Sequence, residues 1–193
     1  MAKSKKIMVI RHAEKPEDAV QGVDINGTDG PENLVVQGWQ RAGALARFFA
    51  PASGQFQHEG IGQPQFLFAS GPIGKKDKKD GEEGSKSNRP EQTITPLSQL
   101  LGIDIDLSFA KGEEAEVAAA AAACDGVALI AWQHEDIPAI ANAILATTNG
   151  VPSPWPGPRF DIVWVFDLQN DGSYVFSQVP QLLLAGDLPT VIT

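Results

Sequence analysis

Residues 7–15 read IMVIRHAEK, an apolar run that ends at a cluster of charged and titratable side chains. Four consecutive apolar residues are typical of a strand that is buried in a parallel sheet. Arg11, His12 and Glu14 then fall at the carboxyl end of this strand, where open α/β sheets bind their ligands. Arginine can hold an anion with two parallel hydrogen bonds, and histidine can act as a nucleophile. This stretch therefore predicts an anion site at the edge of a parallel sheet.

The rest of the chain alternates strand and helix patterns. Apolar runs predict strands at residues 6–10, 65–69, 103–107, 127–132 and 162–167, and an edge strand at 173–178. Amphipathic spacing, prolines in first turns and an alanine-rich stretch predict helices at 37–50, 90–101, 113–123 and 137–147. This order predicts an α/β fold, a three-layer sandwich with a mostly parallel sheet flanked by helices on both faces. We expect a single domain over residues 1–193, with a mobile loop at 71–88 and a proline-rich linker at 150–158.

Composition and charge argue against several classes of protein. The chain has 193 residues, of which 42% are hydrophobic and 20% charged, as in soluble globular proteins, and its apolar runs are too short to span a bilayer. A net charge of −9 disfavours a nucleic-acid binder. Cys124 is the only cysteine, which excludes a disulfide within the chain and argues against a thiolate metal site. We expect a cytoplasmic protein with no membrane or nucleic-acid partner, and the sequence leaves its oligomeric state open.

Polar side chains follow three separate strands of the predicted sheet. Arg11 and His12 follow the first strand, and the second leads through the loop at 71–88 to Arg89. The fourth strand ends at His134 and Glu135. Because carboxyl ends of parallel strands meet at one edge, we expect these side chains to converge. Two arginines and two histidines suit a dianion, and a carboxylic acid completes a set of groups for proton transfer.

Four motifs in register resemble the histidine phosphatase superfamily, which includes phosphoglycerate mutases and acid phosphatases. They are RHAEK at 11–15, LVVQGWQRA at 34–42, RPEQT at 89–93 and WQHED at 132–136. The resemblance covers essentially the whole chain and implies a phosphoglycerate mutase-like fold. Ala13 stands where the superfamily has glycine, so the backbone there must avoid a conformation that is open only to glycine.

The resemblance also implies a mechanism. His12 would attack phosphorus and form a phosphohistidine, which water then hydrolyses. Arg11, Arg89 and His134 would hold the phosphoryl oxygens, without a metal or another cofactor. The implied function is hydrolysis of a phosphomonoester or of a phosphoprotein. We expect the lysines of the loop at 71–88 to steer the anionic substrate towards an open, small pocket.

The proton donor and the reaction class have alternatives. In the acid phosphatase branch an aspartate follows the second histidine, and Glu135 holds that place here, so we favour Glu135. Asp136, Glu14 and a later glutamate, Glu113 or Glu114, are the other candidates. The chain could also be a phosphomutase of the same superfamily, or a non-catalytic module that binds a phosphorylated ligand or a protein. An intact nucleophile argues against the module, because binding alone does not need one.

Overall fold

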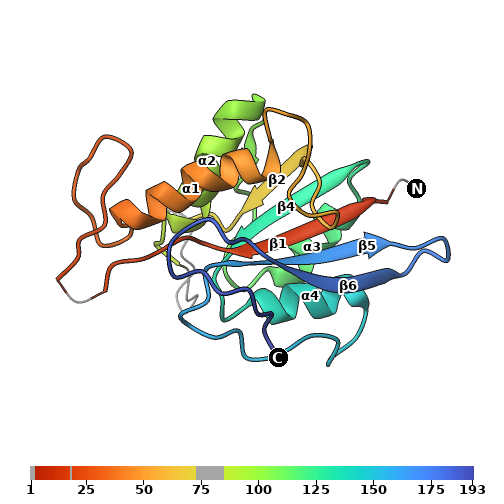
Figure 1. Cartoon of the computed structure of the whole chain (residues 1–193). Helices are drawn as coiled ribbons and strands as arrows, with labels where there is room; N and C mark the ends of the chain where they lie inside the picture. Colours follow the sequence, from red (N-terminus) through yellow and green to blue (C-terminus); the bar gives the residue numbers. More distant parts are fainter. Residues whose placement is uncertain (1–2, 18, 73–84) are drawn as a thin grey trace.

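A six-stranded sheet forms the middle layer of the molecule (Figure 1). The computed structural model describes residues 3–17, 19–72 and 85–193. The strands are β1 (Lys6–Arg11), β2 (Phe66–Ala69), β3 (Ile105–Asp106), β4 (Val127–Trp132), β5 (Ile162–Leu168) and β6 (Tyr174–Pro180). Their order is β3-β2-β4-β1-β5-β6. The first four strands are mutually parallel, whereas β5 runs antiparallel to β1 and β6 antiparallel to β5. The sheet is therefore mostly parallel, as predicted.

Two helices cover each face of the sheet. They are α1 (Val36–Phe49), α2 (Arg89–Leu101), α3 (Glu114–Ala122) and α4 (Ile137–Leu145). One apolar cluster joins α1 and α2 to the sheet, and a second joins α3 and α4 to the opposite face. In β1 the side chains alternate between the clusters, Ile7 and Val9 towards α3 and α4, Met8 and Ile10 towards α1 and α2. The predicted three-layer sandwich is confirmed.

The predicted elements agree with the observed ones to within a few residues, with one clear difference. The strand expected at 103–107 is shorter, since only Ile105 and Asp106 pair with β2. The side chain of Asp106 accepts a hydrogen bond of 2.8 Å from the amide of Ser108 and turns the chain away from the sheet. The edge strand expected at 173–178 is confirmed as β6.

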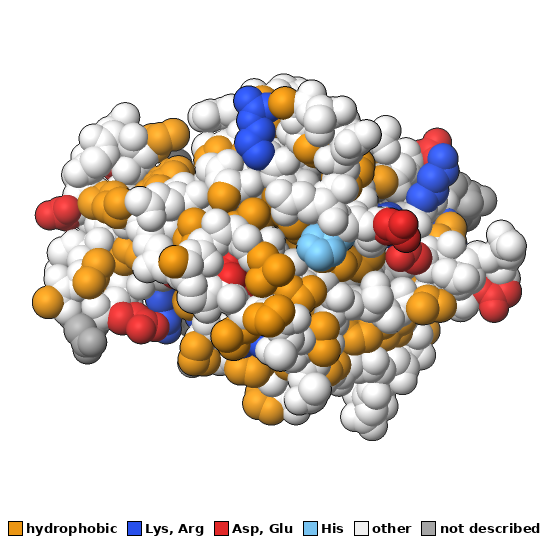
Figure 2. Space-filling view, viewed as in Figure 1, with side chains coloured by type: hydrophobic (Ala, Val, Ile, Leu, Met, Phe, Trp, Pro, Cys, Tyr) orange, Lys and Arg blue, Asp and Glu red, His pale blue; other side chains and the backbone are white. Residues whose placement is uncertain are grey.

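Part of the predicted loop at 71–88 lies outside the described residues. The structure describes Gly71, Pro72 and residues 85–88, but not residues 73–84, which include the lysines expected to steer substrate. In the parts of the chain that are described, no helix is long and apolar enough to cross a bilayer. Figure 2 shows one face, on which charged side chains lie scattered among apolar ones, with no block of Lys and Arg among the described residues there.

Candidate active site

His12 lies directly after β1, at the carboxyl end of the parallel strands. Its amide donates a hydrogen bond of 3.0 Å to the carbonyl of Trp132 at the end of β4. Its side chain is buried, and Nδ1 lies 2.7 Å from the carbonyl oxygen of Ala13. A proton on Nδ1 satisfies this contact and leaves the lone pair on Nε2. The ring is therefore oriented so that Nε2 is available as a nucleophile.

The surroundings of His12 keep its imidazole neutral. Burial lowers the pKa of His12 to about 3. The hydrogen bond to the Ala13 carbonyl opposes this shift, whereas Arg11, Arg89 and His134 add to it. These three residues are the ones that the sequence predicted to converge on His12, and they lie within electrostatic reach of it. A neutral imidazole at pH 7 is the form that can attack phosphorus.

Arg11 is almost fully buried and has unpaired donors. Its guanidinium carbon lies 3.7 Å from the centre of the Phe160 ring, which covers one face of the planar group. Among the described residues, Nε and Nη1 of Arg11 have no hydrogen-bond partner. Burial lowers the pKa of Arg11 to about 10, so the group stays positive at pH 7. Because buried N–H groups of a cation are costly when unpaired, this arrangement favours a bound anion.

Arg89 is the first residue of α2 and faces the same region. Its Nη1 donates a hydrogen bond of 2.9 Å to the carbonyl of Pro31, while its Nε has no partner among the described residues. Burial lowers the pKa of Arg89, and the negative charge of Glu32 and Glu135 opposes this shift. Two arginines therefore present unpaired N–H groups near His12.

The second half of the RPEQT motif fixes α2 in place. Thr93 is fully buried, and its hydroxyl donates to the carbonyl of Arg89 at 2.7 Å and accepts from the amide of Ala13 at 2.8 Å. The side chain of Gln92 accepts a hydrogen bond of 2.8 Å from the amide of Leu34, just before α1. These contacts join three separate segments of the chain around His12.

The structure accounts for the alanine in the RHAEK motif and for the glycine in the LVVQGWQRA motif, Ala13 and Gly38. The described non-glycine residues with positive φ are Ala146 and Leu182, so Ala13 does not need a glycine-only conformation. Its methyl group packs with Leu34 instead. At Gly38 a β-carbon would lie 2.6 Å from the carbonyl oxygen of Glu14, so the absence of a side chain lets α1 approach the loop that follows His12.

His134 and Glu135 follow β4 and lie together at the site. Nδ1 of His134 is 3.1 Å from a carboxylate oxygen of Glu135, without the alignment of a hydrogen bond. Burial lowers the pKa of His134, and Arg11 lowers it further. Burial alone would raise the pKa of Glu135, but its own backbone N–H, His134 and Lys111 outweigh this effect and hold the pKa below its usual value. Glu135 is therefore mainly ionised at pH 7 when no phosphate is bound.

Asp136 lies in a different environment from Glu135. Burial raises the pKa of Asp136, and the negative charge of Glu114 and Glu135 adds to the shift, while Lys111 opposes it. The ammonium of Lys111 lies 3.5 Å from the Asp136 carboxylate. Two neighbouring carboxyl groups with pKa values shifted in opposite directions are typical of proton-transfer sites.

The other candidate proton donors have structural partners. Glu14 accepts two hydrogen bonds from Arg41 through the same oxygen, at 2.9 Å and 2.8 Å. Glu113 accepts from the amide of Ala110 at 2.8 Å, and Glu114 accepts from the indole N–H of Trp132 at 3.2 Å. Glu114 therefore joins the start of α3 to the end of β4, and Glu14 joins the loop that follows His12 to α1.

Two residues in and just after the proline-rich stretch at 150–158 contact the site. The sequence predicted this stretch to be a linker. Phe160 lies against Arg11, and its ring centre is 6.2 Å from that of His12. A β-carbon at Gly157 would lie 3.9 Å from Nε2 of His134. Sequence reasoning missed both residues, because the stretch has no periodicity and matches none of the four motifs. The one available signal was an aromatic residue, Phe160, two positions before the fifth strand.

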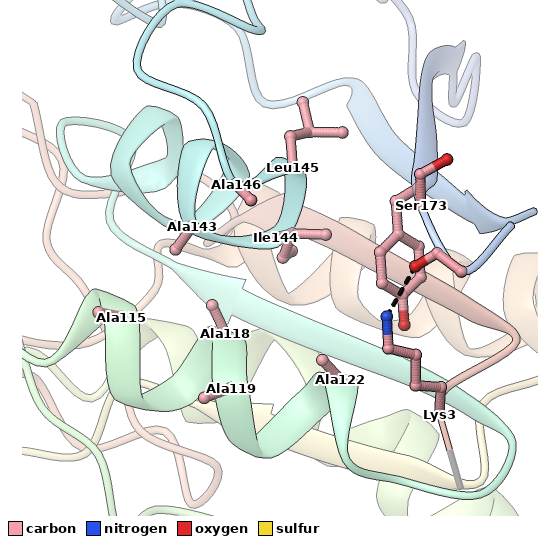
Figure 3. Close-up of a pocket in the computed structure, with 12 residues that line it drawn as sticks. Lys3, Ala115, Ala118, Ala119, Ala122, Ala143, Ile144, Leu145, Ala146 and Ser173 are labelled. Atoms are coloured by element: carbon pink, nitrogen blue, oxygen red, sulfur yellow. Dashed lines mark hydrogen bonds between the residues drawn. The ribbon is translucent and has the colours of Figure 1, made fainter. Parts of the chain in front are cut away.

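A separate pocket of about 280 Å³ lies between α3 and α4, near the amino end of β1 (Figure 3). It is lined mainly by alanine methyl groups, and Lys3 at its edge donates a hydrogen bond of 2.7 Å to the carbonyl of Gly172. It lies at the opposite end of β1 from His12. Within the described residues, no three His, Cys, Asp or Glu side chains are grouped in a way that could hold a metal ion.

No protein-family model and no curated protein sequence matches this chain. Solved structures do match it. One is SixA from Agrobacterium tumefaciens, assigned as a phosphohistidine phosphatase, which is 17% identical with a TM-score of 0.50 over 90% of this chain and 97% of that chain. Another is phosphoglycerate mutase from Plasmodium falciparum, which is 11% identical with a TM-score of 0.50 over 98% of this chain and 99% of that one. These matches confirm the phosphoglycerate mutase-like fold that the motifs predicted.

Proposed function

We propose that this chain, which has the fold of the histidine phosphatase superfamily, is a phosphatase that acts through a phosphohistidine on His12. The observation that carries the proposal is the buried, neutral imidazole of His12 within reach of two arginines, each of which has at least one buried N–H group without a partner among the described residues. A binding site alone needs no nucleophile, whereas this one orients a lone pair towards the place where the arginines favour an anion. The substrate class is a phosphomonoester or a phosphoprotein.

In the first step, Nε2 of His12 attacks phosphorus and the bond from phosphorus to the leaving oxygen breaks. Arg11, Arg89 and His134 hold the three other phosphoryl oxygens while charge redistributes among them. The leaving oxygen takes a proton from Glu135, which must be protonated at this point. A bound phosphate dianion favours that protonation, because its negative charge raises the pKa of a nearby carboxyl group.

In the second step, water attacks the phosphorus of the phosphohistidine and the P–N bond breaks. The water gives a proton to the Glu135 carboxylate formed in the first step, which restores the acid. His12 returns to the neutral form that its burial favours. In this mechanism the two guanidinium groups supply the positive charge and His134 supplies a hydrogen bond from its ring N–H, so no step requires a metal ion.

The test is hydrolysis of 4-nitrophenyl phosphate between pH 5 and pH 8, with and without a strong chelator, by the wild type and by His12→Ala. We expect turnover that resists the chelator and disappears in the variant. A second measurement follows label from a ³²P-phosphodonor, which we expect on His12 in an acid-labile, base-stable bond. Turnover that survives the substitution would exclude His12 as the nucleophile.

The mutase alternative rests on the fold shared with phosphoglycerate mutase. A mutase would label His12 but return the phosphoryl group to another position of the same substrate, with slow loss to water. A binding module would take up inorganic phosphate without labelling His12. The release of free phosphate from the labelled protein therefore separates the three functions.

A further inference from the structure

Phe160 contacts two of the groups that the proposed mechanism assigns to phosphoryl transfer. Its ring centre lies 3.7 Å from the guanidinium carbon of Arg11 and 6.2 Å from the centre of the His12 ring. Stacking uses the face of the guanidinium and leaves its in-plane N–H groups free for an anion. Phe160 is only half-buried, so part of its ring remains open beside the anion site.

The backbone on both sides of Phe160 is fixed. The indole N–H of Trp155 donates a hydrogen bond of 2.8 Å to the carbonyl of Arg159, and Trp155 packs on Trp164 with 4.8 Å between ring centres. The guanidinium of Arg159 donates to the buried carboxylate of Asp161 at 2.6 Å. Phe160 therefore stands between two neighbours that are held by hydrogen bonds.

Carboxylates lie within electrostatic reach of both arginines of the site. The negative charge of Glu135, Glu17 and Glu14 acts on Arg11, and that of Glu32 and Glu135 acts on Arg89. The arginines can balance the anionic phosphoryl group. A second anionic group next to the arginines would meet these carboxylates, whereas one next to His134 would meet the positive charge of Lys15 and Lys111.

Gly157 lies next to His134 at the site. Gly157 has no side chain, and a β-carbon there would lie 3.9 Å from Nε2 of His134, in ordinary van der Waals contact. The segment that ends at Phe160 therefore contributes a flat apolar surface beside Arg11 and His12 and a residue without a side chain beside His134. A planar, uncharged ring next to the phosphorus fits this combination.

We propose that Phe160 is a specificity-determining residue that selects phosphomonoesters whose leaving group presents a flat aromatic ring close to the phosphorus. Aromatic pairs prefer offset or edge-to-face contact, which a saturated ring of similar size cannot provide. This inference rests on the proposed phosphatase activity and names the substrate class of the same site.

The test compares benzyl phosphate with cyclohexylmethyl phosphate, because the two leaving alcohols have similar size and similar basicity. We expect the wild type to prefer benzyl phosphate in kcat/KM by about threefold to tenfold, the range that one aromatic contact supplies. Phe160→Leu should lose this preference, and Phe160→Tyr should keep it. The ratio of the two substrates cancels any general loss of activity in a variant.

The matched control is Phe176→Leu. Phe176 is another half-buried aromatic residue that packs on Trp164 at 5.2 Å between ring centres, but it lies on β6. This variant should lose stability and keep the substrate ratio. The inhibition constant of inorganic phosphate, which has no leaving group, gives a second readout of whether Phe160 only orients Arg11.

An unchanged ratio in Phe160→Leu, with weaker inhibition by phosphate, would overturn the inference and reduce Phe160 to a positioning residue for Arg11. A wild type that hydrolyses both esters equally well would overturn the inference and leave the phosphatase activity standing. If the wild type hydrolyses neither ester nor 4-nitrophenyl phosphate, the proposed function and the inference are both wrong.

Discussion

The side-chain oxygen of Thr93 accepts a hydrogen bond of 2.8 Å from the amide of Ala13, the residue that follows the candidate nucleophile. The same hydroxyl donates to the carbonyl of Arg89 at 2.7 Å. One buried side chain therefore sets the position of α2, which begins with Arg89, relative to His12, although these two residues come from different parts of the chain.

Replacing Thr93 with valine should impair both stability and catalysis. Valine has the same shape but leaves the buried amide of Ala13 unpaired, which costs about 1–3 kcal/mol. We expect this loss in the free energy of unfolding from urea titration, together with a lower kcat/KM because His12 and Arg89 are no longer held together. Thr93→Ser keeps the hydroxyl and should retain most of the activity. Equal activity of the valine and serine variants would contradict the coupling.

The buried, neutral state of His12 should make the stability of the protein depend on pH. In the folded protein burial lowers the pKa of His12 to about 3, whereas an unfolded histidine titrates near 6.5. Below pH 6.5 the unfolded state therefore binds the additional proton, and the contribution of His12 is lost as the pH falls towards 3. At pH 5 this loss amounts to about 2 kcal/mol relative to pH 7.5.

The measurement is chemical denaturation of the wild type and of His12→Asn at pH 7.5 and pH 5. We expect the wild type to lose about 2 kcal/mol more than the variant over this interval. The ring nitrogens of His12 in ¹⁵N NMR spectra should also keep the chemical shifts of a neutral imidazole down to pH 5. An imidazolium signal for His12 at pH 6 would disprove the assignment.

Arg41 joins α1 to the C-terminal segment through a buried ion pair. It donates two hydrogen bonds to Asp187, at 3.0 Å and 2.7 Å, and pairs with Glu14 as well. Asp187→Asn leaves the buried guanidinium with one carboxylate and should cost roughly 3 kcal/mol in the free energy of unfolding. Because Glu14 lies two residues after His12, we also expect a lower kcat.

Acid should reduce the effect of Asp187→Asn. Burial alone would raise the pKa of Asp187, but hydrogen bonds from Arg41 and from the amides of Leu184 and Leu183 outweigh it, so the pKa lies below its usual value. Its contribution is present above the unfolded pKa of 3.8 and is lost as the pH falls through the folded pKa. The control is Asp167→Asn, which removes a partly exposed pair with Lys6 and should cost less than about 1 kcal/mol.

The proton donor can be identified from the dependence of activity on the leaving group. Glu135→Gln should lower kcat for an alkyl phosphate by roughly 10²–10⁴-fold, because an alkoxide is a poor leaving group without a proton. The same variant should affect 4-nitrophenyl phosphate far less, because nitrophenolate leaves unprotonated. Asp136→Asn is the matched control and should change both substrates little. If Asp136→Asn instead causes the selective loss, Asp136 is the donor, as its raised pKa would permit.

Local pattern in the sequence was sufficient for the sheet and helix elements. The strand predicted at 127–132 has the same bounds as β4, and the alanine-rich helix predicted at 113–123 differs from α3 by one residue at each end. Alternating elements favour a parallel sheet, and a parallel sheet collects the carboxyl ends of its strands. The sequence alone therefore predicts Arg11, His12, Arg89 and His134 at one edge of the sheet.

Only the tertiary structure decided which residues complete the site. Phe160 stacks on Arg11 and Asp187 pairs with Arg41, although each pair is far apart in the sequence. The pKa of Glu135 is lowered and that of Asp136 is raised, and both shifts likewise depend on burial and on Lys111. Hydrophobic periodicity reports which face of an element is buried, but not which distant side chain meets it, because that depends on the path of the loops between them.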